Sequence, residues 1–308
     1  MTLHLAVALA GDSFAAEDWI GQVRQADEAG LDFVTFDDHF GRHGPDAVQV
    51  AARVAPLTRH VGLVPVATTT HTEPFHLSTA LATLDWVSRG RAGWQVRISA
   101  DPAEAALLGR RAPLPVEDLI AEAGDAIEVV RRLWDSWQDD AIISDVATGR
   151  YVDRERLHYI DFEGKHFSVK GPSIVPRPPQ GQPVIAALAH SPQIWDALDA
   201  DVFFVTPSDA GDAARIVQRI VPEKKIFVDL AVDGTRTPRQ LADLIQNWWI
   251  GSGIDGFRLH VADVADVTGE LVAELRRRGL FEPSTKPVLR ERLGLPVAVN
   301  RYQEAGRA

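Results

Sequence analysis

The chain has 308 residues, no cysteine, and 43 acidic against 32 basic side chains, so its formal net charge is −11. A chain of this length can bury a large core without disulfides or metals, as one large domain or as two. The acidic charge disfavours nucleic acid and anionic membrane surfaces as partners. The absence of cysteine excludes disulfides, thiolate metal sites and a cysteine nucleophile.

The first residues carry no targeting pattern. Their apolar run starts at Leu3 and stops at Gly11, and no Lys or Arg precedes it. This run is too short for a signal peptide or a membrane-spanning helix. Because the lack of cysteine also fits a reducing compartment, we expect a soluble cytoplasmic protein.

Strand-length apolar runs alternate with segments of helical period along the whole chain. The predicted strands cover residues 3–9, 31–36, 61–67, 92–98, 183–188, 201–205, 225–232 and 256–261. One predicted helix ends at Gly30, and a short one follows Pro45. The other predicted helices cover 73–87, about 117–137, about 210–220, 238–250 and 268–278. Eight such repeats predict a (β/α)₈ barrel, ahead of an open doubly wound sheet.

One connection is too long for an ordinary βα loop. Residues 139–179 contain an alternating run at 158–169, with a plausible turn at Glu163-Gly164. This pattern predicts a hairpin excursion between strands four and five and not a second domain. Residues 279–308 are expected to pack on the barrel as a tail, so the whole chain, 1–308, is interpreted as one barrel domain.

Polar side chains follow most of the predicted strands. In a barrel of this type the active site lies at the C-terminal strand ends, so these residues are candidates. They are Asp37, Asp38, His39, Thr68, Thr69, Thr70, His71, Arg97, Ser99, His190, Ser191, Thr206, Ser208, Asp233 and His260. Asp38 and His39 suit a general base or a metal ligand, but the residues alone favour a turn that caps the next segment.

Metal and nucleotide sites receive little support from these residues. His39, His71 and His260 show no spacing that fixes ligand geometry, and strand one carries no His-x-His pair. No P-loop or G-x-G-x-x-G is present, which disfavours nucleotide kinases and NAD enzymes of the usual kind. We therefore expect no metal.

Tryptophans offer a hint about assembly. Trp86, Trp94, Trp134 and Trp137 are expected to pack helices against strands. Trp248 and Trp249 are adjacent on one predicted helix, so both cannot face its core side. One of them is expected to meet a partner subunit, which favours a homodimer.

Two stretches carry a resemblance to a known family. Residues 61–76 read Val-Gly-Leu-Val-Pro-Val-Ala-Thr-Thr-Thr-His-Thr-Glu-Pro-Phe-His, and residues 84–95 read Leu-Asp-Trp-Val-Ser-Arg-Gly-Arg-Ala-Gly-Trp-Gln. They resemble the bacterial luciferase-like flavin-dependent monooxygenases, in particular the branch of the nitrilotriacetate and dibenzothiophene-sulfone monooxygenases. Further matches, in order, lie at 133–137, 158–167, 171–183, 255–256, 277–281 and 289–296.

The resemblance implies a barrel that binds reduced FMN, or the related deazaflavin F420, and uses O₂ to oxygenate a small organic substrate. A flavin reductase is then the expected partner. By position, Asp38, Thr68, Thr70 and Gln95 are implied to surround the flavin ring, and His190 and Ser191 to lie in the phosphate loop. His39 or His71 is the implied proton donor.

A second hypothesis depends on where the sequence departs from the family pattern. Val116 and Ile120 stand where the family usually has His and Tyr, and the phosphate loop reads Leu-Ala-His-Ser-Pro-Gln-Ile at 188–194, without its two glycines. Side chains at Ala189 and Ile194 obstruct close approach of the backbone to phosphate. The alternative is a flavin-free, non-catalytic barrel that serves as a partner subunit.

Overall fold

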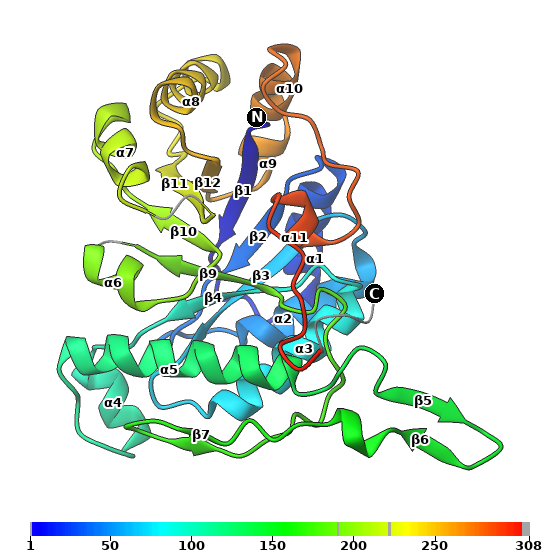
Figure 1. The fold of residues 1–308 in the computed structure, drawn as a ribbon. Helices are drawn as coiled ribbons and strands as arrows, with labels where there is room; N and C mark the ends of the chain where they lie inside the picture. Colours follow the sequence, from blue (N-terminus) through cyan, green and yellow to red (C-terminus); the bar gives the residue numbers. More distant parts are fainter. Residues whose placement is uncertain (1, 190, 221–222, 304–308) are drawn as a thin grey trace.

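The computed structural model describes residues 2–189, 191–220 and 223–303. Eight parallel strands close into a barrel in the order β1-β12-β11-β10-β9-β4-β3-β2 (Figure 1). In chain order they are β1 (His4–Leu9), β2 (Phe33–Phe36), β3 (Gly62–Thr68), β4 (Gly93–Arg97), β9 (Val184–Leu188), β10 (Val202–Val205), β11 (Lys225–Ala231) and β12 (Gly256–His260). The predicted (β/α)₈ barrel is confirmed.

Helices surround this barrel. Those that link or follow its strands are α1 (Ala16–Glu28), α2 (Ala47–Val54), α3 (Pro74–Ser88), α5 (Val116–Asp135), α6 (Pro192–Ala197), α7 (Ala210–Val217), α8 (Pro238–Ser252) and α10 (Glu270–Arg277). Shorter pieces are η1 (Ala55–Leu57), α4 (Pro102–Leu108), η2 (Arg154–Arg156), α9 (Ala265–Thr268) and α11 (Leu289–Arg292). None of the helices within the described ranges is long and apolar enough to cross a bilayer.

Local sequence signals explain where several helices start and stop. A capping box formed by Thr237 and Gln240 opens α8, and Gly253 ends it in the left-handed conformation at φ 76°. Gly30 plays the same part after α1 at φ 70°. These signals set the helix lengths, and the apolar faces then pack on the strands.

The long connection holds two hairpins where the sequence predicted one. β5 (Ile142–Asp145) pairs with β6 (Arg150–Val152), and β7 (Phe162–Glu163) pairs with β8 (Ser168–Val169), both antiparallel. Glu163 still pairs with Ser168, so the second turn lies at residues 164–167 and not at Glu163-Gly164. The first hairpin projects from the barrel (Figure 1).

The tail fastens this connection and closes one end of the barrel. The ring of Tyr302 stacks on His158 at 4.3 Å between centroids. Leu289 and Leu293 of the α11 region pack with Phe33 and Val64 in the barrel interior. Because a Cβ on Gly62 would lie 2.8 Å from a Leu289 methyl group, the fit around Leu289 is tight. The tail therefore closes the N-terminal end of the barrel.

Leu289→Ala is expected to destabilise the fold by about 2–5 kcal/mol, because the fully buried side chain leaves a cavity at the closed end. Urea unfolding measures the change. Val297→Ala is the control, because Val297 is 80% exposed in the same tail and the change should stay within about 0.5 kcal/mol. Equal losses in both variants would show that the tail does not close the barrel.

One part of the tryptophan prediction for α8 is wrong, since both tryptophans contact the core. Trp248 and Trp249 are both partly buried and pack against the main core, and α8 has α7 and α10 beside it. Trp86, by contrast, is 48% exposed, and its indole N–H donates to the carbonyl of Pro176 at 3.4 Å. Trp248 and Trp249 both keep a partly exposed surface, and the predicted contact with a partner subunit stays a prediction.

Candidate active site at the barrel mouth

A cavity of about 640 Å³ opens at the C-terminal ends of the strands, and we name it the mouth cavity. Its walls are apolar, and several polar side chains converge on it from different strands. The apolar lining includes Leu9, Val66, Leu188, Val232 and Val261; the polar lining includes Thr35, Asp37, Gln95, Asp229, Arg258 and His260. Its volume lies in the range usual for small-molecule sites.

An ion pair forms the floor of the mouth cavity. Asp229 and Arg258 stand opposite each other in the register of β11 and β12, so their side chains point to the same side. Arg258 Nε and Nη2 donate to the two oxygens of Asp229, each at 2.6 Å. The guanidinium also lies 3.7 Å from the ring centroid of Phe204. The buried charge of Arg258 is thus compensated by bidentate pairing and by an aromatic face.

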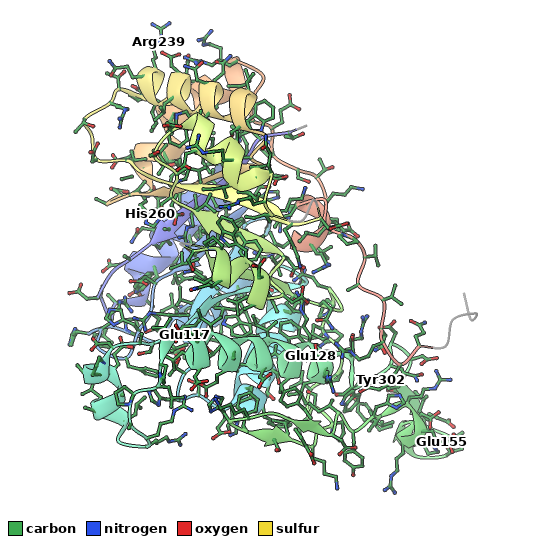
Figure 2. The ribbon with its side chains drawn as sticks, turned by 60° about the vertical axis from the view of Figure 1, so that its left-hand side comes forward. Glu117, Glu128, Glu155, Arg239, His260 and Tyr302 are labelled. Atoms are coloured by element: carbon green, nitrogen blue, oxygen red, sulfur yellow. The ribbon has the colours of Figure 1, made fainter. Side chains whose placement is uncertain are left out.

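His260 extends this ion pair toward solvent. It follows Arg258 by two residues on β12, so both side chains share one face of the strand, and His260 Nε2 lies 3.3 Å from Asp229 Oδ1. Burial works to raise the pKa of Asp229, but hydrogen bonds from His260 and Arg258 outweigh burial and hold that pKa below its usual value. Figure 2 shows His260 at the barrel, far from Glu155 and Tyr302 on the hairpin side.

Gln95 is oriented by the same guanidinium. Arg258 Nη1 donates to Gln95 Oε1 at 2.5 Å, which fixes the amide oxygen toward the floor. The amide nitrogen is thus left on the other side of the amide group, and within the described residues the Gln95 side chain makes no hydrogen bond besides this one. Gln95 therefore offers hydrogen-bond donors to a molecule in the mouth cavity.

A second cavity of about 410 Å³ lies beside the first, between the segment after β2, the end of β3 and the start of α3. We name it the side cavity. Its lining includes Asp38, His39, Phe40, Val66, Thr68 and His76. Val66 lines both cavities, so the two are neighbours across one strand.

A buried carboxylate supports the wall of the side cavity. Glu104 of α4 is only 3% exposed and accepts from Arg97 Nη1 and Nη2 at 3.0 and 3.2 Å and from the Ser99 hydroxyl. Its Oε1 also lies 3.1 Å from His39 Nδ1. Burial alone would raise the pKa of Glu104, but the bonds from Arg97, Ser99 and His39 bring it to about 2. Glu104 is therefore ionised at neutral pH.

The stability that Glu104 contributes should depend on pH. Its folded pKa of about 2 lies below the ordinary 4.5, so the contribution is present above pH 4.5 and is lost as the pH falls toward 2. Glu104→Gln should cost about 1–3 kcal/mol at pH 7, and the difference from the wild type should shrink below pH 4.5. Urea unfolding of both proteins across this pH range measures the difference. A difference in unfolding free energy that stays constant with pH would contradict this role of Glu104.

Comparison with known proteins identifies the family. The family model for luciferase-like monooxygenases matches residues 2–224. The chain belongs to the luciferase-like monooxygenase family. The expected resemblance is confirmed.

Relatives place this luciferase-like chain near two named enzymes. It is 44% identical over 163 residues to nitrilotriacetate monooxygenase component A of Aminobacter aminovorans, covering 52% of this chain and 36% of that protein. It is 34% identical over 283 residues to a subunit of the pristinamycin IIA synthase of Streptomyces pristinaespiralis, covering 91% of this chain and 89% of that protein. The match thus spans about a third of the first relative and nearly all of the second.

Solved structures agree on the fold. The structure of long-chain alkane monooxygenase matches with a TM-score of 0.87 at 19% identity, over 96% of both chains. The F420-dependent tetrahydromethanopterin reductase of Methanopyrus kandleri matches with a TM-score of 0.67 at 13% identity, over 89% of this chain and 99% of that chain. At these identities the likeness shows a shared fold.

The predicted site residues of this luciferase-like chain divide between the two cavities. Asp38, His39 and Thr68 line the side cavity, and Gln95 lines the mouth cavity. Asp38 Oδ2 also accepts from Ala47 N–H at 2.8 Å, so the capping role that the sequence left open is present as well. Burial raises the pKa of Asp38, against a smaller opposing effect of that hydrogen bond.

The other predicted residues lie outside these linings. Thr70 is buried, and its hydroxyl accepts from the backbone of Ser99 at 3.0 Å. His71 has a left-handed backbone at φ 67°, and burial lowers its pKa. Ser191 precedes α6 and makes no side-chain cap there. His190 lies outside the described residues. No group of three or more metal-ligating side chains occurs in the described ranges.

Sequence reasoning missed Glu104, Asp229 and Arg258. Asp229 and Arg258 lie inside strands, and only the barrel register shows that they meet. Glu104 could have been found, because Asp101-Pro102-x-Glu104 is a helix-start pattern, and Asp101 does cap α4 by accepting from Ala103 N–H. Polar residues within strands can thus reach the mouth as well as residues after them.

The mouth cavity fits the ring of a flavin. Its volume of about 640 Å³ is adequate, its walls are apolar, and the Gln95 amide offers free donors. Arg258 already pairs with Asp229, so it is a poor phosphate ligand. Ser191, whose hydroxyl caps nothing, is the described candidate for the phosphate end.

Proposed function

We propose that this chain is a monooxygenase that uses reduced FMN and O₂ on a small organic substrate. One observation carries the proposal over the flavin-free alternative. The mouth cavity stays open and ring-sized, and the Arg258 guanidinium turns the Gln95 amide nitrogen away from the floor. A barrel that only supports a partner has no need of an open cavity with an oriented free donor.

The predicted cofactor-binding residues take the following parts in this proposal. Gln95 donates to the ring from the mouth cavity, and Asp38, Thr68 and Thr70 lie along the β2 and β3 side of it. Ser191 and His190 hold the phosphate end. The reduced flavin supplies the two electrons for the reduction of O₂. The protein binds the ring, excludes water and moves protons.

His39 is the proposed proton carrier. It lines the side cavity and contacts a carboxylate, whereas His71 lines neither cavity and has a pKa lowered by burial. One oxygen atom of O₂ leaves as water, so protons must reach the site during turnover. An imidazole beside a carboxylate suits this task.

Partners form the rest of the proposal. By their names, the nitrilotriacetate monooxygenase relative is one component, and the pristinamycin IIA synthase relative one subunit, of a multi-component enzyme. We propose that a separate flavin reductase supplies the reduced cofactor, and that one barrel domain, 1–308, acts in the cytoplasm as a homodimer. Light scattering at micromolar concentration tests the dimer, and a monomer there would overturn it.

An isotope experiment tests the activity. The protein, FMN, NADH and a flavin reductase are incubated under ¹⁸O₂ with a panel of sulfides, amines, alcohols and carboxylates, and a parallel set contains F420 and its reductase. Incorporation of one ¹⁸O into a product, dependent on this protein and FMN, supports the proposal. Flavin oxidation at the uncatalysed rate with every compound would refute it.

A further inference from the structure

We infer that Glu104 is a positioning residue that fixes the proton of His39 on Nδ1 and presents His39 Nε2 to the side cavity as the proton acceptor. This inference rests on the proposed function for the reaction it serves, and the geometry itself needs no flavin. The substrate class that follows is a small molecule that places an O–H or N–H group against His39.

Glu104 is held more firmly than a surface carboxylate. Arg97 at the end of β4 grips both of its oxygens, and the Ser99 hydroxyl donates to Oε2. The backbone around Arg97 is fixed in turn, because Thr69 N–H donates to the Arg97 carbonyl at 2.9 Å. Glu104 thus reaches His39 from a frame built by two adjacent strands and α4.

The charge of Glu104 decides the tautomer of His39. An ionised carboxylate accepts hydrogen bonds and donates none, so the contact of 3.1 Å requires a proton on His39 Nδ1. A neutral imidazole then keeps its lone pair on Nε2. His39 Nε2 has no protein partner in the described part of the chain, and the side chain is 36% exposed where it lines the side cavity.

The proton step balances simply. A substrate O–H or N–H gives its proton to His39 Nε2, and the electron pair of that bond stays on the substrate atom. The resulting imidazolium carries one positive charge beside the negative charge of Glu104. Nε2 later returns the proton to the departing water or to product, which restores the neutral imidazole.

Within the described ranges, two other histidines also contact carboxylates. Asp229 Oδ1 lies 3.3 Å from His260 Nε2, so this contact favours a proton on Nε2 and leaves Nδ1 as the acceptor, the reverse of the arrangement at His39. His4 Nδ1 lies 3.2 Å from Asp32 Oδ1 at the closed end of the barrel, with its side chain 14% exposed. That pair lies far from the mouth and serves as an internal control.

Nitrogen-15 NMR of histidine-labelled protein at pH 8.5 tests the inference without flavin. His39→Gln assigns the His39 signals, and the same spectrum reports His4. In the wild type the Nδ1–H tautomer of His39 should exceed the Nε2–H tautomer by about tenfold or more. Glu104→Gln should lower this ratio several-fold, Glu104→Asp should restore it in part, and His4 should not change.

The outcomes are decisive in each direction. An Nε2–H tautomer of wild-type His39, or a ratio unchanged in Glu104→Gln, overturns the inference. If Glu104→Gln does not fold, the wild-type ratio alone decides, and Ser99→Ala, which keeps the contact between Glu104 and His39, should retain it. Absence of flavin binding by the wild type would refute the proposed function, but the tautomer of His39 measured by NMR would still stand. With turnover established, Glu104→Gln should lower kcat about tenfold or more at unchanged affinity for reduced FMN.

Discussion

His39→Gln is expected to lower turnover about 10²–10⁴-fold, because the proposed proton carrier is removed while the mouth cavity is left intact. The affinity for reduced FMN should be nearly unchanged, since His39 lines the side cavity and not the mouth cavity. Stopped-flow turnover and anaerobic flavin titration measure the two quantities separately.

His71→Gln is the matched control for this prediction. His71 follows β3, the neighbour of the strand β2 that precedes His39, but His71 lines neither cavity, so turnover should stay close to that of the wild type. Equal losses in the two variants, or a loss in His39→Gln explained by weaker flavin binding, would remove His39 from the proposed chemistry.

Arg258→Met is expected to destabilise the fold by about 3–5 kcal/mol, because it leaves the Asp229 carboxylate buried without its partner. Asp229→Asn/Arg258→Met should recover part of this loss, since no unpaired charge then remains. Arg277→Ala is the control. Arg277 pairs with Glu274 at the surface, where solvent screens the pair, so this variant should unfold close to the wild type.

The pH dependence of this pair has a defined sign. The pKa of Asp229 lies below its ordinary value in the folded state, so the pair stabilises the fold above the unfolded carboxyl pKa of about 3.9 and loses this effect as the pH falls through the folded value. Urea unfolding should show a smaller difference in unfolding free energy between the wild type and Arg258→Met at pH 3–4 than at pH 7. A gap independent of pH would mean that the floor is held by packing alone.

Hydrophobic period and helix-end glycines were enough to predict the barrel. All eight predicted strands are present, with ends that shift by a residue or two, such as 31–36 against Phe33–Phe36. These runs are long and apolar, so burial determines them regardless of their neighbours. The connection at 139–179 was harder, because its strands have two to four residues and depend on turns such as the one that Asp145 caps through Ala147 N–H.

Strand-end position and the family resemblance together predicted part of the site. Asp38, His39, Thr68 and Gln95 do line cavities. Thr70 looked equivalent to Thr68 in the sequence. However, β3 ends at Thr68, and the Thr70 hydroxyl two residues later accepts a hydrogen bond from the Ser99 backbone N–H. Asp229 and Arg258 are 29 residues apart and meet only through the pairing register of the neighbouring strands β11 and β12. A period-2 pattern gives the face of a residue and not its partner on the neighbouring strand.

An anaerobic titration with reduced FMN, followed by protein fluorescence, tests the central claim that the mouth cavity binds a flavin. The wild type should bind with a micromolar or lower Kd. Ala231→Trp, which places an indole in the mouth cavity from an exposed position, should abolish binding, whereas Ala147→Trp on the distant β5–β6 hairpin should not. Absence of wild-type binding at high micromolar flavin, or equal binding by Ala231→Trp, would contradict the account.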